Sequence, residues 1–308
     1  MIKKLPDGNS PLNELAKFAD VNFIVTDLDG TLIEQGDKVI GQLLKVGKAG
    51  RLFRNRTYIT IATGRTYHGA KAIIEQLQLK KGMPIVLYNG AIVISYQTNE
   101  ILYRKTINFA VIKELCRIID LKNSSLLAYC FVMNQEVFND EINEVVIETV
   151  HGYGSKKAQK DINQLDIYWH SSFREEINPN AILISKESLG DGMQELIEYL
   201  ENSNEVSYTD SGNGFFEIRS KGVDKGIIFK VLEERRFFKV KKSLAIGDND
   251  NDMELLQQAD IGVVVSNGSE KAIQAADYMC KNAGASGVLD VMAVIKSAQI
   301  YCGEGYQG

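Results

Sequence analysis

Two separate parts of the chain alternate short apolar runs with segments of helical periodicity. In the first part, "NFIVTD" (22–27), "TYITIATGR" (57–65) and "PIVLYNG" (84–90) have the length and β-branched content of buried strands. Apolar residues at helical spacing lie between them, over 37–54 and 66–79. Strand–helix–strand alternation of this kind is typical of a parallel sheet with crossover helices.

The same alternation returns after residue 221. Helices are expected at 224–235, 252–258, 269–277 and 287–298, and strands at "SLAIGD" (243–248) and "IGVVVSN" (261–267). This pattern extends the expected parallel sheet with strands that are distant in sequence from the first three.

The stretch between these two parts has a different pattern. "AIVISYQTNEILYRKTI" (91–107) predicts two antiparallel strands around an Asn-containing turn, and "NAILIS", "EVSYTD" and "FFEIRS" follow as strand candidates. The sequence therefore predicts an α/β domain with a mostly parallel central sheet, interrupted by an inserted α+β domain. The expected division is 1–91, 92–216 and 217–308.

Composition narrows the classes of function. The 308 residues carry a formal net charge of −5, and Lys and Arg gather only in short clusters, which argues against a nucleic-acid partner. The four cysteines are widely spaced and form no CxxC pair, so a reducing compartment is expected. We find no secretory signal and no apolar run long enough to span a membrane, and we therefore expect a cytoplasmic protein without a membrane partner.

Acidic and hydroxyl-bearing turns follow three of the expected strands. They are "DLDGT" (27–31), "ATGR" (62–65) and "GDNDND" (247–252). Ligands bind at the carboxyl ends of parallel strands, so neighbouring strands would bring one set of residues together: Asp27, Asp29, Thr63, Asp248 and Asp252. Four carboxylates cannot share a small site as bare anions, and oxygen-only ligation suits Mg²⁺.

Two simpler interpretations stay open for these turns. Each could be a polar loop without a ligand, and Lys225, near the start of an expected helix, could be a solvated surface lysine. Calcium is rejected, because a calcium loop that starts at Asp248 needs Gly at its sixth position and Glu at its twelfth. Those positions hold Met253 and Ala259.

Taken in order, "DLDGT", "ATGR", "KGVDKG" and "GDNDND" resemble the four motifs of the haloacid dehalogenase-like phosphatase superfamily. "LYNGAIVI" and the long insert between the second and third motifs resemble its Cof-type branch, subfamily IIB, with a C2B cap domain. The resemblance covers about residues 21–298 and implies a Rossmann-like core with an inserted cap.

The resemblance also implies roles for individual residues. Asp27 would be the nucleophile that forms an aspartyl-phosphate, Asp29 the general acid and base, and Lys225 the group that neutralises charge. The implied phosphate-binding residues are Leu28, Gly30, Thr63, Gly64, Lys225 and Asn251. The implied ligands of Mg²⁺ are Asp27, the backbone carbonyl of Asp29, and Asp248, with Asp252 in a supporting place.

The chain departs from the family in one loop and leaves the cap undefined. Where the family often has Met-Gly-Asn-Ala, this chain has Val265, Ser266, Asn267 and Gly268, so the loop backbone is in question. Arg65 and Asn89 lie on core turns and are candidates for substrate contact. Weaker candidates, for which a structural role is favoured, lie in the cap: His151, Lys156, Lys157, Trp169, His170 and Arg174.

The resemblance implies a Mg²⁺-dependent phosphatase that acts on small phosphomonoesters, with sugar phosphates or related metabolites as the expected class. Two alternatives remain: a phosphomutase or phosphotransferase of the same superfamily, and a catalytically silent binding module. The expected partner is the small-molecule substrate, and the expected assembly is a monomer or a small homo-oligomer.

Overall fold

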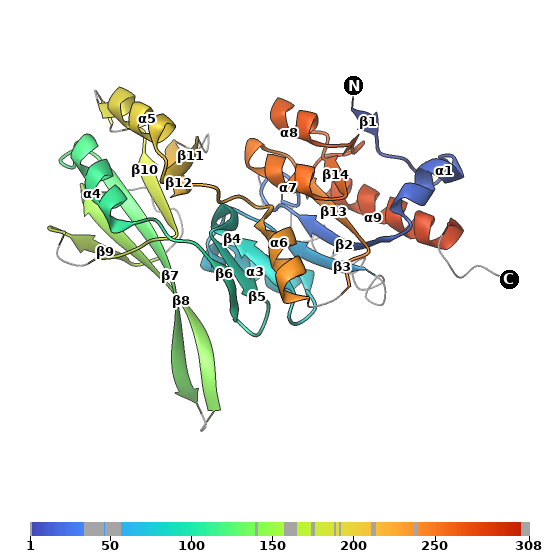
Figure 1. Cartoon of the computed structure of the whole chain (residues 1–308), viewed down its shortest axis with the longest axis horizontal. Coiled ribbons are helices and arrows are strands. Elements are labelled where there is room, and N and C mark those ends of the chain that lie inside the picture. Colours follow the sequence, from blue (N-terminus) through green and yellow to red (C-terminus); the bar gives the residue numbers. More distant parts are fainter. Residues whose placement is uncertain are drawn as a thin grey trace.

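The computed structural model describes residues 2–33, 46, 57–138, 141–156, 165–173, 176–187, 189–190, 192–210, 214–236 and 239–302. Figure 1 shows two lobes, a core that carries both ends of the chain and a cap built from the middle of it. Apart from Val46, the helix expected at 37–54 lies outside the described residues. No helix in these ranges is long and apolar enough to cross a membrane.

The core is built on a six-stranded parallel sheet. Its order is β1 (Lys3–Lys4), β15 (Tyr278–Met279), β14 (Ile261–Val264), β13 (Lys242–Gly247), β2 (Val21–Thr26) and β3 (Tyr58–Ile61). Every neighbouring pair is parallel. The expected α/β class with a mostly parallel sheet is therefore confirmed, and strands distant in sequence lie side by side at its centre.

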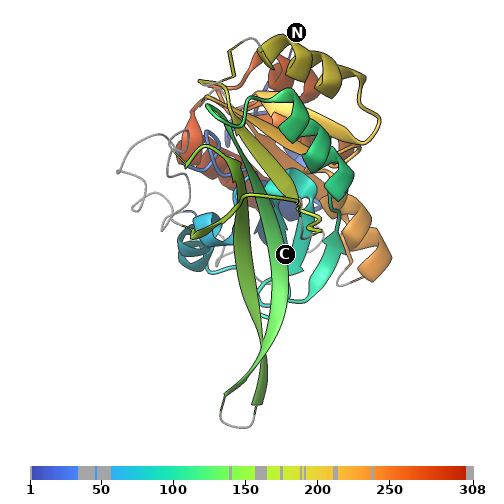
Figure 2. The same cartoon turned by 90° about the vertical axis from the view of Figure 1, so that its left-hand side faces the viewer.

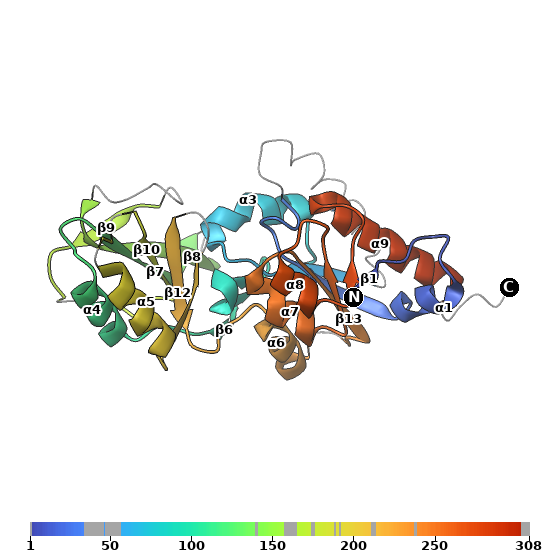
Figure 3. The same cartoon turned by 90° about the horizontal axis from the view of Figure 1, so that it is seen from above.

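Helices cover both faces of this sheet because its strands are apolar on both sides. One face packs against α1 (Leu12–Leu15), the 3₁₀ turn η1 (Ala16–Phe18), α3 (Tyr67–Leu77) and α9 (Gly284–Tyr301); the other packs against α6 (Ile227–Arg235), α7 (Met253–Gln258) and α8 (Glu270–Ala275). The alternation is visible in β2, where Ile24 faces the first set and Phe23 and Val25 face the second. Figure 3 shows the two helical layers.

The strand expected at 84–90 is present over 84–87 and lies next to the end of β3, but it belongs to a separate small sheet. β4 (Pro84–Leu87) pairs antiparallel with β5 (Ile92–Ser95), which pairs with β6 (Ile101–Arg104), and this three-stranded sheet meets β3 through a single parallel bridge between Ala62 and Val86. The chain reverses at the 3₁₀ turn η3 (Tyr88–Gly90), whose three residues have φ of 51°, 52° and 103°. This reversal brings β5 back beside β4 instead of leading to a crossover helix.

The cap is an antiparallel-rich sheet with helices on one face. Its strand order is β11 (Val206–Asp210), β12 (Phe215–Ser220), β10 (Ala181–Ser185), β7 (Ser125–Phe138), β8 (Glu141–Gly154) and β9 (Ile167–His170). Helices α4 (Phe109–Ile118) and α5 (Gly192–Asn202) pack on one face around Leu126, Ile182 and Ile218. The far end of the β7–β8 hairpin projects beyond both lobes (Figure 2). The middle of the chain has the expected α+β character. The domain boundaries at 91 and 216 stay a prediction, although β12, which runs to Ser220, belongs to the cap sheet and places Glu217 in the cap.

A carboxylate from the cap reaches the core at the start of α3. Glu148 of β8 accepts hydrogen bonds from the backbone N–H groups of Tyr67 (2.6 Å) and His68 (2.7 Å) and from the hydroxyl of Tyr88 (2.5 Å). The first N–H groups of a helix lack partners within it and favour a negative charge. Glu148 of the cap therefore accepts hydrogen bonds from the unpaired N–H groups at the start of a core helix. Burial raises the pKa of its carboxyl group.

We expect Glu148→Gln to loosen this contact. An amide presents one accepting oxygen and turns its own N–H₂ toward a backbone donor, so a buried donor is left unpaired at a cost of about 1–3 kcal/mol. Faster hydrogen exchange at the amides of Tyr67 and His68, with a lower melting temperature, would show it. Glu195→Gln makes the same charge change on the exposed surface of α5 and should leave both measurements unchanged.

Candidate active site

The three acidic or hydroxyl-bearing turns meet at the carboxyl ends of adjacent strands. β2 lies between β13 and β3, so Asp27 follows the central strand, Asp248 follows one neighbour and Thr63 lies just beyond the other. Backbone hydrogen bonds continue the alignment, with Asp27 N donating to the carbonyl of Ile246 (2.9 Å) and Ala62 N to that of Thr26 (3.0 Å). The sheet therefore brings together residues that are more than two hundred positions apart.

Lys225 is buried at the centre of the acidic residues. Its Nζ lies 2.6 Å from Asp27 Oδ1 and 2.7 Å from Asp252 Oδ1, and the exposed fractions of the three side chains are 1%, 5% and 0%. Asp248 completes the group, since one carboxylate oxygen from each of Asp27, Asp248 and Asp252 lies within 4.8 Å of the others. The solvated-lysine alternative is thus wrong.

The electrostatics of this group favour a cation. Burial raises the pKa of Asp27 well above its usual value, and repulsion from Asp252 and Asp248 adds to this, while Lys225 opposes it. Burial is also the main cause that raises the pKa of Asp248 to about 6. Burial disfavours the charge on Lys225, but Asp252 and Asp27 outweigh it and raise the pKa of that lysine.

The donor set fits a divalent metal. Three carboxylates face a single lysine in the cluster, so negative charge remains after Lys225 is paired. All donors are oxygens, which is the set that Mg²⁺ prefers. Asp252 is further fixed because its Oδ2 accepts from the backbone N–H groups of Asp248 (3.0 Å) and Asn249 (3.1 Å), so it orients the loop that carries Asp248. The loop then turns into η5 (Asp250–Asp252).

Two glycines allow this crowding. A Cβ on Gly30, whose φ is +90°, would come within 2.2 Å of Asp248 Oδ2, and a Cβ on Gly247 within 2.6 Å of the Cβ of Asp252. Thr31, next to Gly30, donates from its hydroxyl to Asp248 Oδ1 (2.6 Å). Sequence reasoning did not single out Thr31, although its place inside "DLDGT" was a usable signal.

Asp29 is turned away from the buried cluster. It pairs with Arg65 through two hydrogen bonds, from Nη2 to Oδ1 (2.5 Å) and from Nε to Oδ2 (2.7 Å), and its side chain is 54% exposed. The hydrogen bond to Asp29 raises the pKa of Arg65. Asp29 thus lies beside the cluster on the solvent side.

The candidate phosphate-binding residues surround the same strand ends. Thr63 is buried, accepts at its hydroxyl from Arg65 N (3.1 Å), and precedes Gly64, which packs against the amide of Asn89. Asn251 donates from Nδ2 to Asn89 Oδ1 (3.0 Å). Leu28 is fully buried in the core, so only its backbone can take part in such a site.

The loop that departs from the family keeps a useful contact. Asn267 donates from Nδ2 to the carbonyl of Gly30 (3.0 Å), which ties this loop to the turn that carries Asp29. Ser266 is not among the residues with positive φ, so a serine is accommodated there without backbone strain.

The cap candidates contact one another. His151 Nδ1 lies 2.8 Å from His170 Nε2, and Lys156 lies over the ring of Trp169 at 6.0 Å. Lys157 and Arg174 lie outside the described residues.

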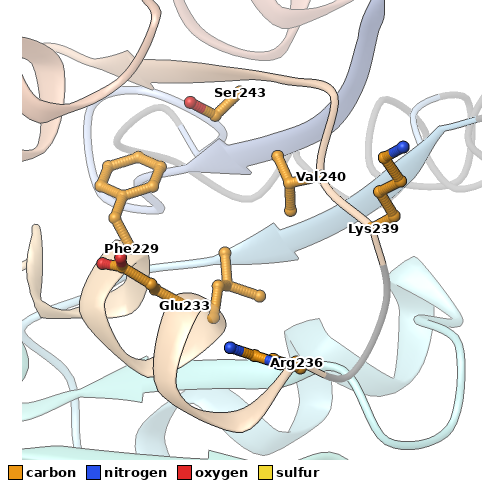
Figure 4. Close-up of a pocket in the computed structure, with 7 residues that line it drawn as sticks. Phe229, Glu233, Arg236, Lys239, Val240 and Ser243 are labelled. Carbon is orange, nitrogen blue, oxygen red and sulfur yellow. The ribbon is translucent and has the colours of Figure 1, made fainter.

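A hollow of about 510 Å³ lies at the opposite end of β13. Figure 4 shows its lining, which comes from α6, the segment after it and the start of β13: Phe229, Leu232, Glu233, Arg236, Lys239, Val240 and Ser243. Ser243 is near the amino end of the strand that Asp248 follows, so this hollow is separate from the acidic cluster.

Comparison with known proteins agrees with the geometry. Residues 24–292 match the model of the haloacid dehalogenase-like hydrolases. The chain belongs to this family. A relative from Bacillus subtilis, the 5-amino-6-(5-phospho-D-ribitylamino)uracil phosphatase YitU, is 27% identical over 261 residues, which is 82% of this chain and 90% of that protein.

Solved structures share the fold. A haloacid dehalogenase-like hydrolase from Bacteroides thetaiotaomicron has a TM-score of 0.65 at 21% identity, covering 91% of this chain and 99% of that one. The subclass IIB sugar phosphatase BT4131 has a TM-score of 0.63 at 16% identity, covering 90% and 98%. The family resemblance seen in the sequence is confirmed, and the chain is a hydrolase of the haloacid dehalogenase-like type.

We expect Mg²⁺ to stabilise the protein through the acidic cluster. At a concentration one hundred times the dissociation constant, the gain in the free energy of unfolding is about 2.7 kcal/mol, and it should appear as a higher melting temperature. Asp248→Asn should reduce the gain, whereas Asp250→Asn should keep it, because Asp250 bonds Ser269 and Lys271 instead. If Mg²⁺ left the melting temperature of the wild-type protein unchanged, the metal assignment would be contradicted.

Proposed function

We propose that this family member is a Mg²⁺-dependent phosphatase that hydrolyses small phosphomonoesters through an aspartyl-phosphate on Asp27. The observation that carries the proposal is the buried contact of Lys225 with Asp27 and Asp252, beside Asp248, at the carboxyl ends of β2 and β13. A nucleophile, a fixed cation and a set of oxygen ligands are thus held within one small volume.

Asp27 is the proposed nucleophile. Lys225 holds its Oδ1, and the other carboxylate oxygen attacks phosphorus. The bond from phosphorus to the leaving oxygen breaks as the new bond forms, and Asp29 gives a proton to that oxygen. A water then attacks the aspartyl-phosphate and passes its proton to Asp29, which releases phosphate and restores Asp27.

Asp29 must leave Arg65 to perform this role. The two-fold pairing holds the carboxylate beside the site and not over Asp27. An arriving phosphate is itself a partner for a guanidinium, so it can compete for Arg65 and free Asp29. Thr63, the amide of Gly64 and Asn251 are the proposed groups that hold the remaining phosphoryl oxygens.

Asp27, the carbonyl of Asp29 and Asp248 would hold Mg²⁺, with Asp252 orienting the loop around Asp248. When bound, the metal neutralises charge on the phosphoryl group as phosphoryl transfer proceeds. Lys225 supplies a fixed share of the same neutralisation from the protein.

The proposed substrates are phosphate esters of small polyhydroxylated metabolites. Support comes from the relative that acts on a phosphoribitylamino compound and from the structural neighbour that is a sugar phosphatase. The substrates of both enzymes carry the phosphate on a hydroxylated carbon chain. The four cysteines are free thiols, which fits a reducing compartment such as the cytoplasm.

Release of inorganic phosphate from a panel of sugar phosphates, sugar-alcohol phosphates and nucleotides tests the proposal. Asp27→Asn should lower turnover by about a thousandfold or more, as loss of a covalent nucleophile does. It also relieves carboxylate repulsion, so its melting temperature should not fall. Asp250→Asn is the matched control and should stay active. Near-normal turnover by Asp27→Asn would exclude this nucleophile, and no release from any member of the panel with Mg²⁺ present would argue against a phosphatase.

A further inference from the structure

The backbone and the side chain of Asn89 are both hydrogen-bonded, and they contact three of the candidate phosphate-binding residues: Thr63, Gly64 and Asn251. It is 5% exposed, and its left-handed backbone (φ 52°) is one that asparagine tolerates. Its N–H donates to the carbonyl of Thr63 (3.0 Å), its Oδ1 accepts from Asn251 (3.0 Å), and its Nδ2 donates to Glu217 Oε2 (3.1 Å). A Cβ added to Gly64 would come within 2.9 Å of Nδ2, so the amide group also packs on that glycine.

Glu217 comes from the cap. It lies on β12 between Phe216 and Ile218, which pack under α4 and α5, so its side chain is on the opposite face of the cap sheet. Its register partner Leu183 packs against a buried apolar cluster that joins cap residues such as Leu127 to core residues such as Tyr88, so this face of the cap sheet is turned toward the core. Burial raises the pKa of Glu217, and the positive charges of Arg219 and Lys225 oppose that shift by favouring the carboxylate.

The donors and acceptors in this chain of contacts fix one another. A carboxylate only accepts, so Asn89 must turn its N–H₂ toward Glu217 and its carbonyl oxygen toward Asn251. Asn251 must then also present its N–H₂, of which one hydrogen goes to Asn89 and the second remains to donate. A donor is the group that an anion needs, whereas the carbonyl oxygen of a flipped amide would repel it.

We propose that Glu217 is a positioning residue that, through Asn89, sets the amide of Asn251 to donate to the phosphate. This inference rests on the function proposed above, because it assigns Asn251 to the phosphate group. Since Glu217 belongs to the cap and both asparagines belong to the core, separation of the lobes breaks the relay. The phosphate site is therefore complete only while the cap is seated.

The affinity for inorganic phosphate tests the relay, because this ligand has no leaving group that the cap could contact. A glutamine at position 217 can turn either its oxygen or its N–H₂ toward Asn89, so it no longer fixes the orientation of that amide. We expect Glu217→Gln to weaken phosphate binding by up to about tenfold, the loss typical of one hydrogen bond to a charged group. Calorimetric titration in the presence of Mg²⁺ measures it. Glu195→Gln, the same change on α5 of the cap, should bind phosphate like the wild type. Wild-type affinity in Glu217→Gln would overturn the proposal.

A complementary pair of substitutions separates positioning from simple structural damage. Asn89→Asp alone places two carboxylates together and should weaken phosphate binding as Glu217→Gln does. In the double variant Asn89→Asp, Glu217→Gln, the new amide at position 217 can donate to the new carboxylate at position 89. That carboxylate can still accept from Asn251. The double variant should therefore regain most of the phosphate affinity. If its loss of affinity equalled the sum of the losses in the two single variants, the relay would be overturned.

The background of Asn251→Ala tests the last link. If Glu217 acts through Asn251, Glu217→Gln should cause no further loss of phosphate affinity there; an undiminished loss would mean a direct contact and would refute the relay. Turnover by the wild type is scored separately. Phosphate release by the wild type with unaltered binding in Glu217→Gln would refute only the relay. Binding effects as expected without any turnover would refute only the phosphatase.

Discussion

The repulsion among Asp27, Asp248 and Asp252 is the constraint that the rest of the site depends on. Burial makes this repulsion severe, and it raises the pKa of both Asp27 and Asp248. Lys225 relieves part of it from a fully buried place. Buried ion pairs seldom add stability, since their desolvation offsets the attraction between the charges. The cluster therefore holds the proposed nucleophile Asp27 next to the charge of Lys225 at a cost in free energy that the surrounding α/β core offsets.

The parallel sheet is what makes such crowding possible. Carboxyl ends of neighbouring parallel strands meet at one edge, so single residues after β2, β3 and β13 converge without long loops. Close approach also needs missing side chains. Gly30 and Gly247 leave the room that Asp248 and Asp252 occupy, and only glycine accepts the φ of +90° at Gly30 easily. The spacing of glycines and aspartates in the motifs thus has a direct steric reason.

Local signals made much of this predictable. Strand periodicity and turn residues located β2, β3, β13 and β14 and their polar ends, so the convergence of Asp27, Asp248 and Asp252 could be expected. The roles of these residues stay predictions. Glu148 and Glu217 were missed because each acts across the two lobes, on partners far away in sequence. Nothing in their own strands distinguishes them from solvent-facing carboxylates. β4 was expected as a strand and is one, but its place in a separate small sheet was not foreseen, because three consecutive left-handed residues cannot be predicted from an apolar run.

Those three residues give the turn at 88–90 a part in joining the lobes. Tyr88 donates a hydrogen bond to the cap carboxylate of Glu148, and Asn89 donates one to the cap carboxylate of Glu217. Gly90 packs against the backbone next to Lys225, where a Cβ would come within 2.0 Å of the carbonyl oxygen of Asp224. Left-handed conformations persist only where the surroundings hold them. Here the cap supplies two of the contacts, so one short, strained turn links the position of the cap to the geometry of the proposed phosphate site.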